Sequence, residues 1–255
     1  MADEQDPTVS IVMPTYRQAA FLPDALEGLA NQTFKDFELI VVQDGPDPET
    51  HIVLKQSEYM RGKKWYTRKE NGGTAEALNQ GFEYARGKYW TWVSSDNVMH
   101  WDWLKTLVHV LDEMPYDVIY TGYIRDTGRM AADGWASNGG CKPTVFQHPY
   151  EPLINSENCF IGPSFLYRCE LHEKVGPHRG AISHDYDWWL RAEEHGTIGW
   201  WEDCLATYRV HGGRVTVTKK KTYDANKWRK AALARRAAAA ESTVGVYRDA
   251  DVQPE

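Results

Sequence analysis

The sequence of 255 residues lacks several features that mark specialised classes of protein. No apolar run has the length of a membrane span or a secretion signal, so we expect no transmembrane segment and a cytoplasmic protein. The four cysteines show no C-x-x-C spacing, which disfavours a zinc site and indicates reduced thiols. Internal repeats and low-complexity segments are also missing. A formal net charge of −7 disfavours a general nucleic-acid binder.

What remains is typical of a folded globular chain. Hydrophobic residues make up 42% and charged residues 25% of the sequence, and the length suffices for one large domain or a domain with a lobe. The 11 tryptophans and 14 tyrosines exceed what a core of this size requires. Most of them are expected to pack in the interior, and the alternative is that some stack against sugars or bases.

Strand and helix patterns alternate through the first hundred residues. Strands are expected at residues 8–13, 37–42, 65–68 and 88–95, and helices over 22–29, after the N-cap Asp47, and from Thr74 to Gly87. This alternation predicts an α/β fold with a mostly parallel sheet. Because such a sheet gathers its loops at one edge, we expect Tyr16, Asp44, Gly73 and Asp96 to meet there.

The second half of the chain is less regular. Residues 122–163 are rich in Gly, Asn and Pro, which suits either an active-site flap or a surface excursion. Around this segment, helices are expected at residues 104–111, 184–195 and 224–241, and strands at 118–120, 164–167, 198–201 and 206–210. For the basic helix 224–241 we favour packing on the body, and contact with a membrane surface or a phosphate-rich acceptor is the alternative.

Asp96 is the first candidate for a functional site. It ends an aromatic and β-branched run, and a carboxylate at the carboxyl end of a strand is placed to hold a metal or a charged ligand. The competing interpretation is that Asp96 caps a helix or turns the chain.

Several ordered segments resemble glycosyltransferase family 2, an inverting family with the GT-A nucleotide-sugar-binding fold. The matching segments are residues 9–16, 31–45, 77–87, 94–97 and 184–191, and the resemblance spans most of residues 8–213. It implies a GT-A (Rossmann-like) α/β domain with a smaller acceptor-side lobe. Residues 1–97 would form the nucleotide-sugar half, 98–215 the acceptor and catalytic half, and 216–255 a basic C-terminal helix and tail.

The resemblance also implies roles for individual residues. Asp185 matches the catalytic base, Asp96 the last acidic residue of a metal-binding D-x-D motif, and His211 a histidine that reaches the metal or diphosphate. The implied donor site comprises Pro14, Thr15, Tyr16, Asp44, Gly73, Ser95 and Asp96. The implied acceptor side comprises His184, Asp187, Trp188 and Trp189.

Two departures from the family pattern concern the metal. Ser94 and Ser95 stand where relatives usually have an acidic residue before Asp96, and Gln43 replaces a frequent acidic residue beside Asp44. One carboxylate is nevertheless compatible with Mn²⁺ or Mg²⁺, because substrate phosphates and water complete the shell of such ions.

The chemistry expected from this resemblance is inverting transfer of a sugar from a nucleotide sugar, with a UDP-sugar favoured, to a hydroxyl acceptor. A divalent cation would offset charge on the leaving diphosphate, and an aspartate would take the acceptor's proton. For Asp185 the alternative is a helix N-cap, with Asp187 as the other candidate base, and His211 could be an ordinary strand-end histidine.

Two other functions compete with glycosyl transfer. One is a catalytically silent sugar- or nucleotide-binding module, which the thin acidic motif motivates. The other is a nucleotidyltransferase, which the absence of a Gly-rich phosphate loop after the first strand disfavours. The acceptor could be a saccharide, a lipid-linked carrier, a protein or a modified nucleic acid, since a fold does not determine it.

Overall fold

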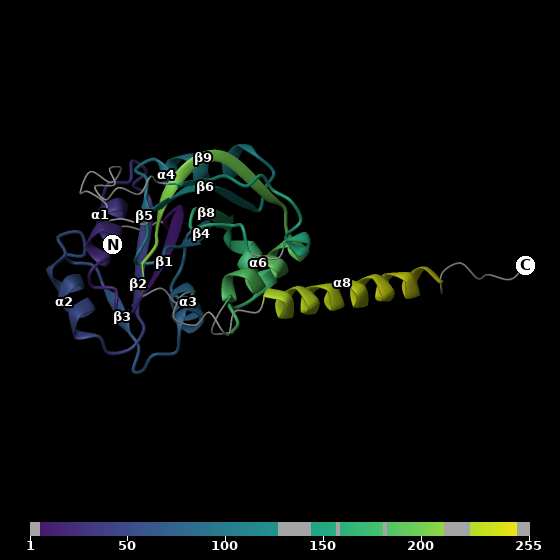
Figure 1. Ribbon diagram of the computed structural model, residues 1–255, viewed down its shortest axis with the longest axis horizontal. Helices are drawn as coiled ribbons and strands as arrows, with labels where there is room; N and C mark the ends of the chain where they lie inside the picture. The colour runs from purple at the N-terminus through teal and green to yellow at the C-terminus, as the bar shows by residue number, and fades with distance from the viewer. Residues whose placement is uncertain (1–5, 127–143, 157–158, 181–182, 212–224, 249–255) are drawn as a thin grey trace, which may run out of the picture.

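The computed structural model describes residues 6–126, 144–156, 159–180, 183–211 and 225–248. A sheet of nine strands forms its centre, in the order β3-β2-β1-β4-β8-β6-β9-β5, with β7 paired to β6. The strands are β1 Val9–Thr15, β2 Phe37–Gln43, β3 Trp65–Thr67, β4 Tyr89–Trp92, β5 Val98–Met99, β6 Val118–Asp126, β7 Thr144–Phe146, β8 Phe165–Arg168 and β9 Ile198–Arg209. Figure 1 shows the sheet curling where β6 and β9 run together.

The direction of strand pairing divides the sheet. The strands β3, β2, β1 and β4 are mutually parallel, as are β6 and β9. The pairs β4–β8, β6–β8, β6–β7 and β5–β9 are antiparallel. The parallel strands β3, β2, β1 and β4 all belong to residues 1–97, the predicted nucleotide-sugar half. The sheet continues without a break across the boundary predicted at residue 97.

Helices cover both faces of this sheet. They are α1 Leu22–Ala30, α2 Pro48–Gln56, α3 Thr74–Phe82, α4 Trp103–Glu113, α5 Cys169–Val175, α6 His184–His195 and α8 Ala225–Arg248, with a 3₁₀ turn η1 at Leu153–Asn155. Leu22, Leu54 and Leu104 place α1, α2 and α4 in the cluster that contains Ile11 of β1. Val12, the next residue of β1, faces the opposite cluster, which is formed mainly by α3, α5 and α6. Because successive side chains of a strand point to opposite faces, β1 contributes to the hydrophobic clusters on both sides of the sheet.

Several predicted elements have different ends in the structure. The helix α3 ends at Phe82, and Gly87 instead lies against the backbone of β1, where an added Cβ would be 2.6 Å from the amide nitrogen of Ser10. The strand before Asp96 ends at Trp92, so Asp96 lies in a turn. The two strands predicted over 198–210 are a single strand, β9, whose pairing with β6 shifts register around Gly122. Glu202 and Asp203, which are exposed, interrupt the apolar pattern within this strand. The sequence therefore predicted two strands.

The last helix, α8, begins against α6 and then leaves the body (Figure 1). Arg235 and Arg236 form ion pairs with Glu194 and Glu193 of α6, at 2.9 Å and 2.6 Å. Ala232 is fully buried in the same contact. Packing on the body, the favoured prediction for this helix, is therefore observed for its first half, and the helix continues past the predicted end at residue 241. Over the part of the chain that the structure describes, no helix combines the length and apolar character needed to span a membrane.

Candidate functional site

The turn after β2 is organised by the carboxylate of Asp44. Its two oxygens accept hydrogen bonds from the backbone amides of Gly72 and Gly73, at 3.0 Å and 2.8 Å, and from the Asn71 side chain at 3.0 Å. The guanidinium of Arg68 forms an ion pair with it, with an N–O distance of 3.0 Å. The resemblance places Asp44 in the donor site. In this structure its oxygens hold the loop that leads into α3.

The loop after β1 is fixed to this turn. The amide of Asp44 donates to the carbonyl of Thr15, and Asp47 accepts from the amide of Arg17 while capping α2. Arg17 has a φ of 53°, a left-handed conformation unusual for a residue with a side chain. These contacts place the loop of Pro14, Thr15 and Tyr16 beside Asp44, and the role of this loop as a donor site stays a prediction.

Gln43, which stands where an acidic residue is frequent, has a structural role. Its side chain is buried and donates to the carbonyls of Gly45 and Asp47, at 3.1 Å and 3.3 Å. The amide thus closes the turn that presents Asp44. An acidic side chain has no donor for these two carbonyls when ionised.

Asp96 and His211 meet in space although 115 residues separate them. Nε2 of His211 lies 3.0 Å from Oδ2 of Asp96, and both side chains are about 15% exposed. The ring of Phe21, from the loop after β1, packs on His211 with centroids 4.2 Å apart. The structure therefore brings together the two predicted metal ligands, and links them to the loop that carries Tyr16.

The side chains of Asp96 and His211 are ligand types that a divalent cation accepts, but they are only two. Carboxylate oxygen and imidazole nitrogen are both ligands of Mn²⁺, and Mg²⁺ accepts one or two carboxylates when phosphates and water complete its shell. Across the described residues, no group of three or more His, Cys, Asp or Glu side chains is arranged to hold a metal. Among the described residues, Asp96 and His211 would thus supply two ligands to a cation, with substrate phosphates and water completing its shell.

Asp185 opens onto a cavity of about 210 Å³. Its position in the first turn of α6 follows Ser183, whose left-handed φ of 56° turns the chain into the helix. One oxygen of Asp185 accepts from the amide of Tyr186 at 2.9 Å. The cavity is otherwise lined by aromatic, small and polar residues: Trp92, Ser94, Asn97, Tyr123, Cys159, Ile161, Gly162, Pro163, Phe165, Trp189 and Tyr208.

The cavity unites the turn around Asp96 with the start of α6. Ser94 and Asn97 flank Asp96 and share the cavity wall with Asp185. Ser95 is buried between them, with 3% exposure. Burial raises the pKa of Cys159, and the charge of Asp185 raises it further, so this thiol is a neutral part of the wall.

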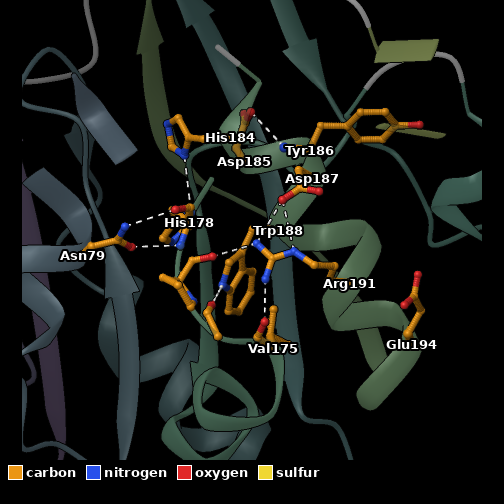
Figure 2. A network of polar contacts seen from close by, with 12 residues as sticks. Asn79, Val175, His178, His184, Asp185, Tyr186, Asp187, Trp188, Arg191 and Glu194 are labelled. Carbon is orange, nitrogen blue, oxygen red and sulfur yellow. Dashed lines mark hydrogen bonds and ion pairs between the residues drawn. The ribbon is translucent and has the colours of Figure 1, made fainter. Parts of the chain in front are cut away.

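Among the predicted acceptor-side residues, only Trp189 lines this cavity. Asp187 and Arg191 form an ion pair with an N–O distance of 3.0 Å, and each side chain is under 5% exposed. Trp188 is fully buried and donates from its indole nitrogen to the carbonyl of Gly176 at 3.1 Å. Asp187 and Trp188 therefore stabilise the interior. Figure 2 shows this network beneath the start of α6, with His184 beside Asp185.

Sequence reasoning missed other residues at the site. His178, which lies below the cavity beside His184, was not a candidate, because an isolated histidine in an irregular segment carries no spacing signal. Tyr123 and Cys159 line the cavity but fall in the segment 122–163, where no periodicity indicated which side chains face inward.

A family model covers the region described here. The chain matches the model of Glycosyl transferase family 2 over residues 10–176. This match contains the predicted donor residues from Pro14 to Asp96. Asp185 and His211 lie beyond its end.

Curated relatives of the chain are named as glycosyltransferases. An uncharacterized glycosyltransferase of Rickettsia prowazekii is 29% identical over 224 residues, which are 83% of this chain and 67% of the relative. An uncharacterized glycosyltransferase of Rickettsia bellii is 35% identical over 222 residues, which are 80% of this chain and 30% of the relative.

Solved structures share the fold. TarS 1–349 of S. aureus in complex with UDP-GlcNAc has a TM-score of 0.65 and 22% identity, over 81% of this chain and 60% of TarS 1–349. The mannosyltransferase PcManGT of Pyrobaculum calidifontis in complex with GDP-Man and Mn²⁺ has a TM-score of 0.60 and 15% identity, over 96% of this chain and 81% of that one. With the family model matching well over half of its length, the chain belongs to glycosyl transferase family 2 and has the GT-A fold.

Proposed function

We propose that this chain transfers a sugar from a nucleotide sugar to a hydroxyl acceptor, with inversion at the anomeric carbon. The observation that carries the proposal is the shared cavity: Asp185 lines it together with Ser94 and Asn97, which flank Asp96. A candidate base and a candidate diphosphate site are thus neighbours. The structural relatives were solved in complex with UDP-GlcNAc (TarS) and with GDP-Man and Mn²⁺ (PcManGT), which supports a nucleotide-sugar donor.

Asp185 is proposed as the general base. In a single displacement, the acceptor hydroxyl attacks the anomeric carbon from the side opposite the leaving diphosphate, so a base must stand on the acceptor side. The carboxylate of Asp185 has one oxygen bonded to the amide of Tyr186, and Asp187 is held in a buried ion pair. Of these two aspartates, only Asp185 faces the cavity.

Asp96 and His211 are proposed to hold the divalent cation jointly with the donor's phosphates. When bound, such an ion offsets the negative charge that develops on the leaving diphosphate. The protein's own contribution is to hold both side chains at one point. The contacts of Phe21 with His211 and of the amide of Arg209 with Asn97 fix the two segments that carry them.

The nucleoside is proposed to bind at the loops after β1 and β2. The ring of Tyr16 would stack on the base, and the Asp44-bound loop with Gly73 would form the opposite side. A UDP-sugar is the preferred donor in this proposal, because TarS, at 22% identity, has UDP-GlcNAc in its complex. The acceptor is a sugar-sized hydroxyl compound, since the aromatic walls of the cavity suit the apolar face of a sugar ring.

The test separates binding from transfer with two variants. UDP, GDP, UDP-GlcNAc and GDP-Man are titrated calorimetrically with Mn²⁺ and with chelator, and donor turnover is followed over an acceptor panel. We expect base-selective, Mn²⁺-dependent binding by the wild type. Asp185→Asn should retain this binding and lose at least about 100-fold in turnover, the scale of general-base catalysis.

The second variant concerns the cation. Asp96→Ala should bind the nucleotide equally with Mn²⁺ and with chelator, because the protein's carboxylate ligand is gone. Near-normal turnover by Asp185→Asn would remove this residue from the base role. Nucleotide binding by the wild type without hydrolysis or transfer would favour a silent binding module. The presence of a single carboxylate, Asp96, in the metal-binding motif is consistent with this second hypothesis.

A further inference from the structure

His178 lies at the centre of a group of aromatic rings below the site. Its side chain is 3% exposed, and its ring stacks on Phe82 and Trp188 and meets Trp92 edge to face, with centroids 4.8 to 6.0 Å apart. Asn79 of α3 fixes its backbone from 99 residues away: the amide of His178 donates to Asn79 Oδ1 at 2.8 Å, and Asn79 Nδ2 donates to the carbonyl of His178 at 3.1 Å. His178 is therefore rigidly placed.

The ring of His178 forms a hydrogen bond with the ring of His184. Their Nδ1 atoms are 3.4 Å apart, so one ring donates and the other accepts (Figure 2). Burial lowers the pKa of both histidines, which keeps the pair neutral near pH 7, although the charges of Asp185 and Asp187 raise that of His184. The hydrogen bond occupies the Nδ1 atom of each ring.

The remaining nitrogen of His184 is on the side of the ring away from His178. Unlike His178, His184 is partly exposed, and its Nε2 has no hydrogen-bond partner among the residues that the structure describes. His184 immediately precedes Asp185, the residue that opens onto the cavity. A neutral ring held in place by His178 therefore belongs to the residue that directly precedes the proposed base.

We propose that His184 binds a sugar hydroxyl through Nε2 and that His178 is the positioning residue that orients it. The inference rests on the proposed function. A hydroxyl is the partner that fits both neutral tautomers, because it accepts from an N–H and donates to a lone pair. A phosphate would require the N–H form and gains little from a neutral ring. The hydroxyl belongs either to the sugar of the donor or to the acceptor.

Amide side chains test which nitrogen matters. The amide introduced by His184→Gln reaches the position of Nε2, whereas the shorter amide introduced by His184→Asn lies near Nδ1. At the partner, His178→Asn retains a polar group near Nδ1, and His178→Phe retains a ring without it. We expect His178→Asn to restore most of the affinity that His178→Phe loses, and His184→Gln, which keeps a polar group at Nε2 but loses the Nδ1 contact with His178, to retain more affinity than His184→Asn. His184→Asn and His178→Phe should each weaken sugar recognition about tenfold, the size of one lost hydrogen bond in a protected site.

The readout compares UDP-GlcNAc with UDP in calorimetry with Mn²⁺, and KM with kcat for p-nitrophenyl glycosides as acceptors. GDP-Man and GDP replace them if the wild type selects guanine. A loss confined to the sugar nucleotide assigns the hydroxyl to the donor. A rise in acceptor KM, with unchanged binding of the sugar nucleotide, assigns it to the acceptor. Either result supports the proposal.

Three results would overturn it. Unchanged affinities and KM in His184→Asn and His178→Phe would remove both residues from sugar binding. An equal loss for UDP and UDP-GlcNAc would indicate a purely structural role, as would a loss in His184→Gln as large as that in His184→Asn. Failure of the wild type to bind any of the nucleotides would instead reject the proposed function, so the two failures are distinguishable.

Discussion

Two aspartates at the start of α6, Asp185 and Asp187, have different surroundings and different roles. Asp185 faces the cavity, and Asp187 pairs with Arg191, whose guanidinium also donates to the carbonyls of Val175 and Pro177. Asp187 thus neutralises a buried cation. The i,i+4 spacing of Asp187 and Arg191 on a helix already indicates such a pair from the sequence, which favours Asp185 over Asp187 as the base.

Asp44 gives a prediction about stability. In Asp44→Asn, an NH₂ group replaces one carboxylate oxygen and faces the donors of Asn71, Gly72 or Gly73, which already surround the side chain. Because hydrogen bonds to a charged acceptor contribute about 1.5–3 kcal/mol each, we expect the free energy of unfolding to fall by about 2 kcal/mol. Urea denaturation at neutral pH measures this change.

A surface carboxylate provides the control. Glu58 pairs with Arg61, but both side chains are more than three-quarters exposed. Glu58→Gln should therefore change stability by less than about 0.5 kcal/mol. Equal effects of the two substitutions would mean that the Asp44 contacts contribute no more than an exposed ion pair.

At the scale of whole elements, the first half of the fold was predictable because periodicity and caps agree. The apolar spacing of α1 and the cap of α2 by Asp47 are local signals, and both helices begin at the predicted residues. The end of α3 was predicted wrongly because Gly87 is required by close approach to Ser10 in β1, a tertiary contact. Signals within one element identify its type, whereas contacts between elements set its limits.

The docked half of α8 gives a prediction for an element. Arg235 contacts Glu194 through two nitrogens, and Arg236 contacts Glu193, which is 8% exposed at its side chain. Replacing both arginines by alanine should weaken docking on α6. We expect amide hydrogen exchange to accelerate across residues 228–239, with the nucleotide-binding half unchanged.

Lys230 supplies a matched control on the same helix. It is exposed, so Lys230→Ala should leave the exchange pattern as in the wild type. Unchanged exchange in the double arginine variant would show that apolar packing of Trp228 and Ala232 suffices for docking. The alternative contact of α8 with a membrane or phosphate-rich surface stays a prediction, although two of its arginines pair with the body.

Across the whole molecule, the sequence indicated which residues approach one another but not what holds them. Asp96 and His211 were predicted together from the resemblance, and they are 3.0 Å apart. The His178–His184 pair and the cavity depend on side-chain packing between α3, β4 and α6, for which the sequence has no local signal. The part of the site fixed by motif order was therefore predictable, and the part made by packing was not.

Buried histidines on one side of the sheet give a prediction for global stability. Burial lowers the pKa of His172 to about 4, and it also lowers that of His178. Because the unfolded chain binds these protons near pH 6.5, stability is fully present above that pH and is lost as the pH falls towards 4. The loss is at most about 1.4 kcal/mol per pH unit for each histidine that titrates. Urea midpoints between pH 7 and 4 measure it.

His172→Gln separates this effect from other titrations. The neutral amide cannot take up a proton, so the variant should show a shallower loss of stability between pH 6.5 and 4 than the wild type, whatever its stability at pH 7. The groups around His172 include Phe82, Trp90, Tyr167 and Trp188, with Arg191 as the nearby cation that lowers its pKa further. An identical slope in variant and wild type would show that His172 is not protonated on unfolding in this range, and would assign the acid sensitivity of the fold to other groups.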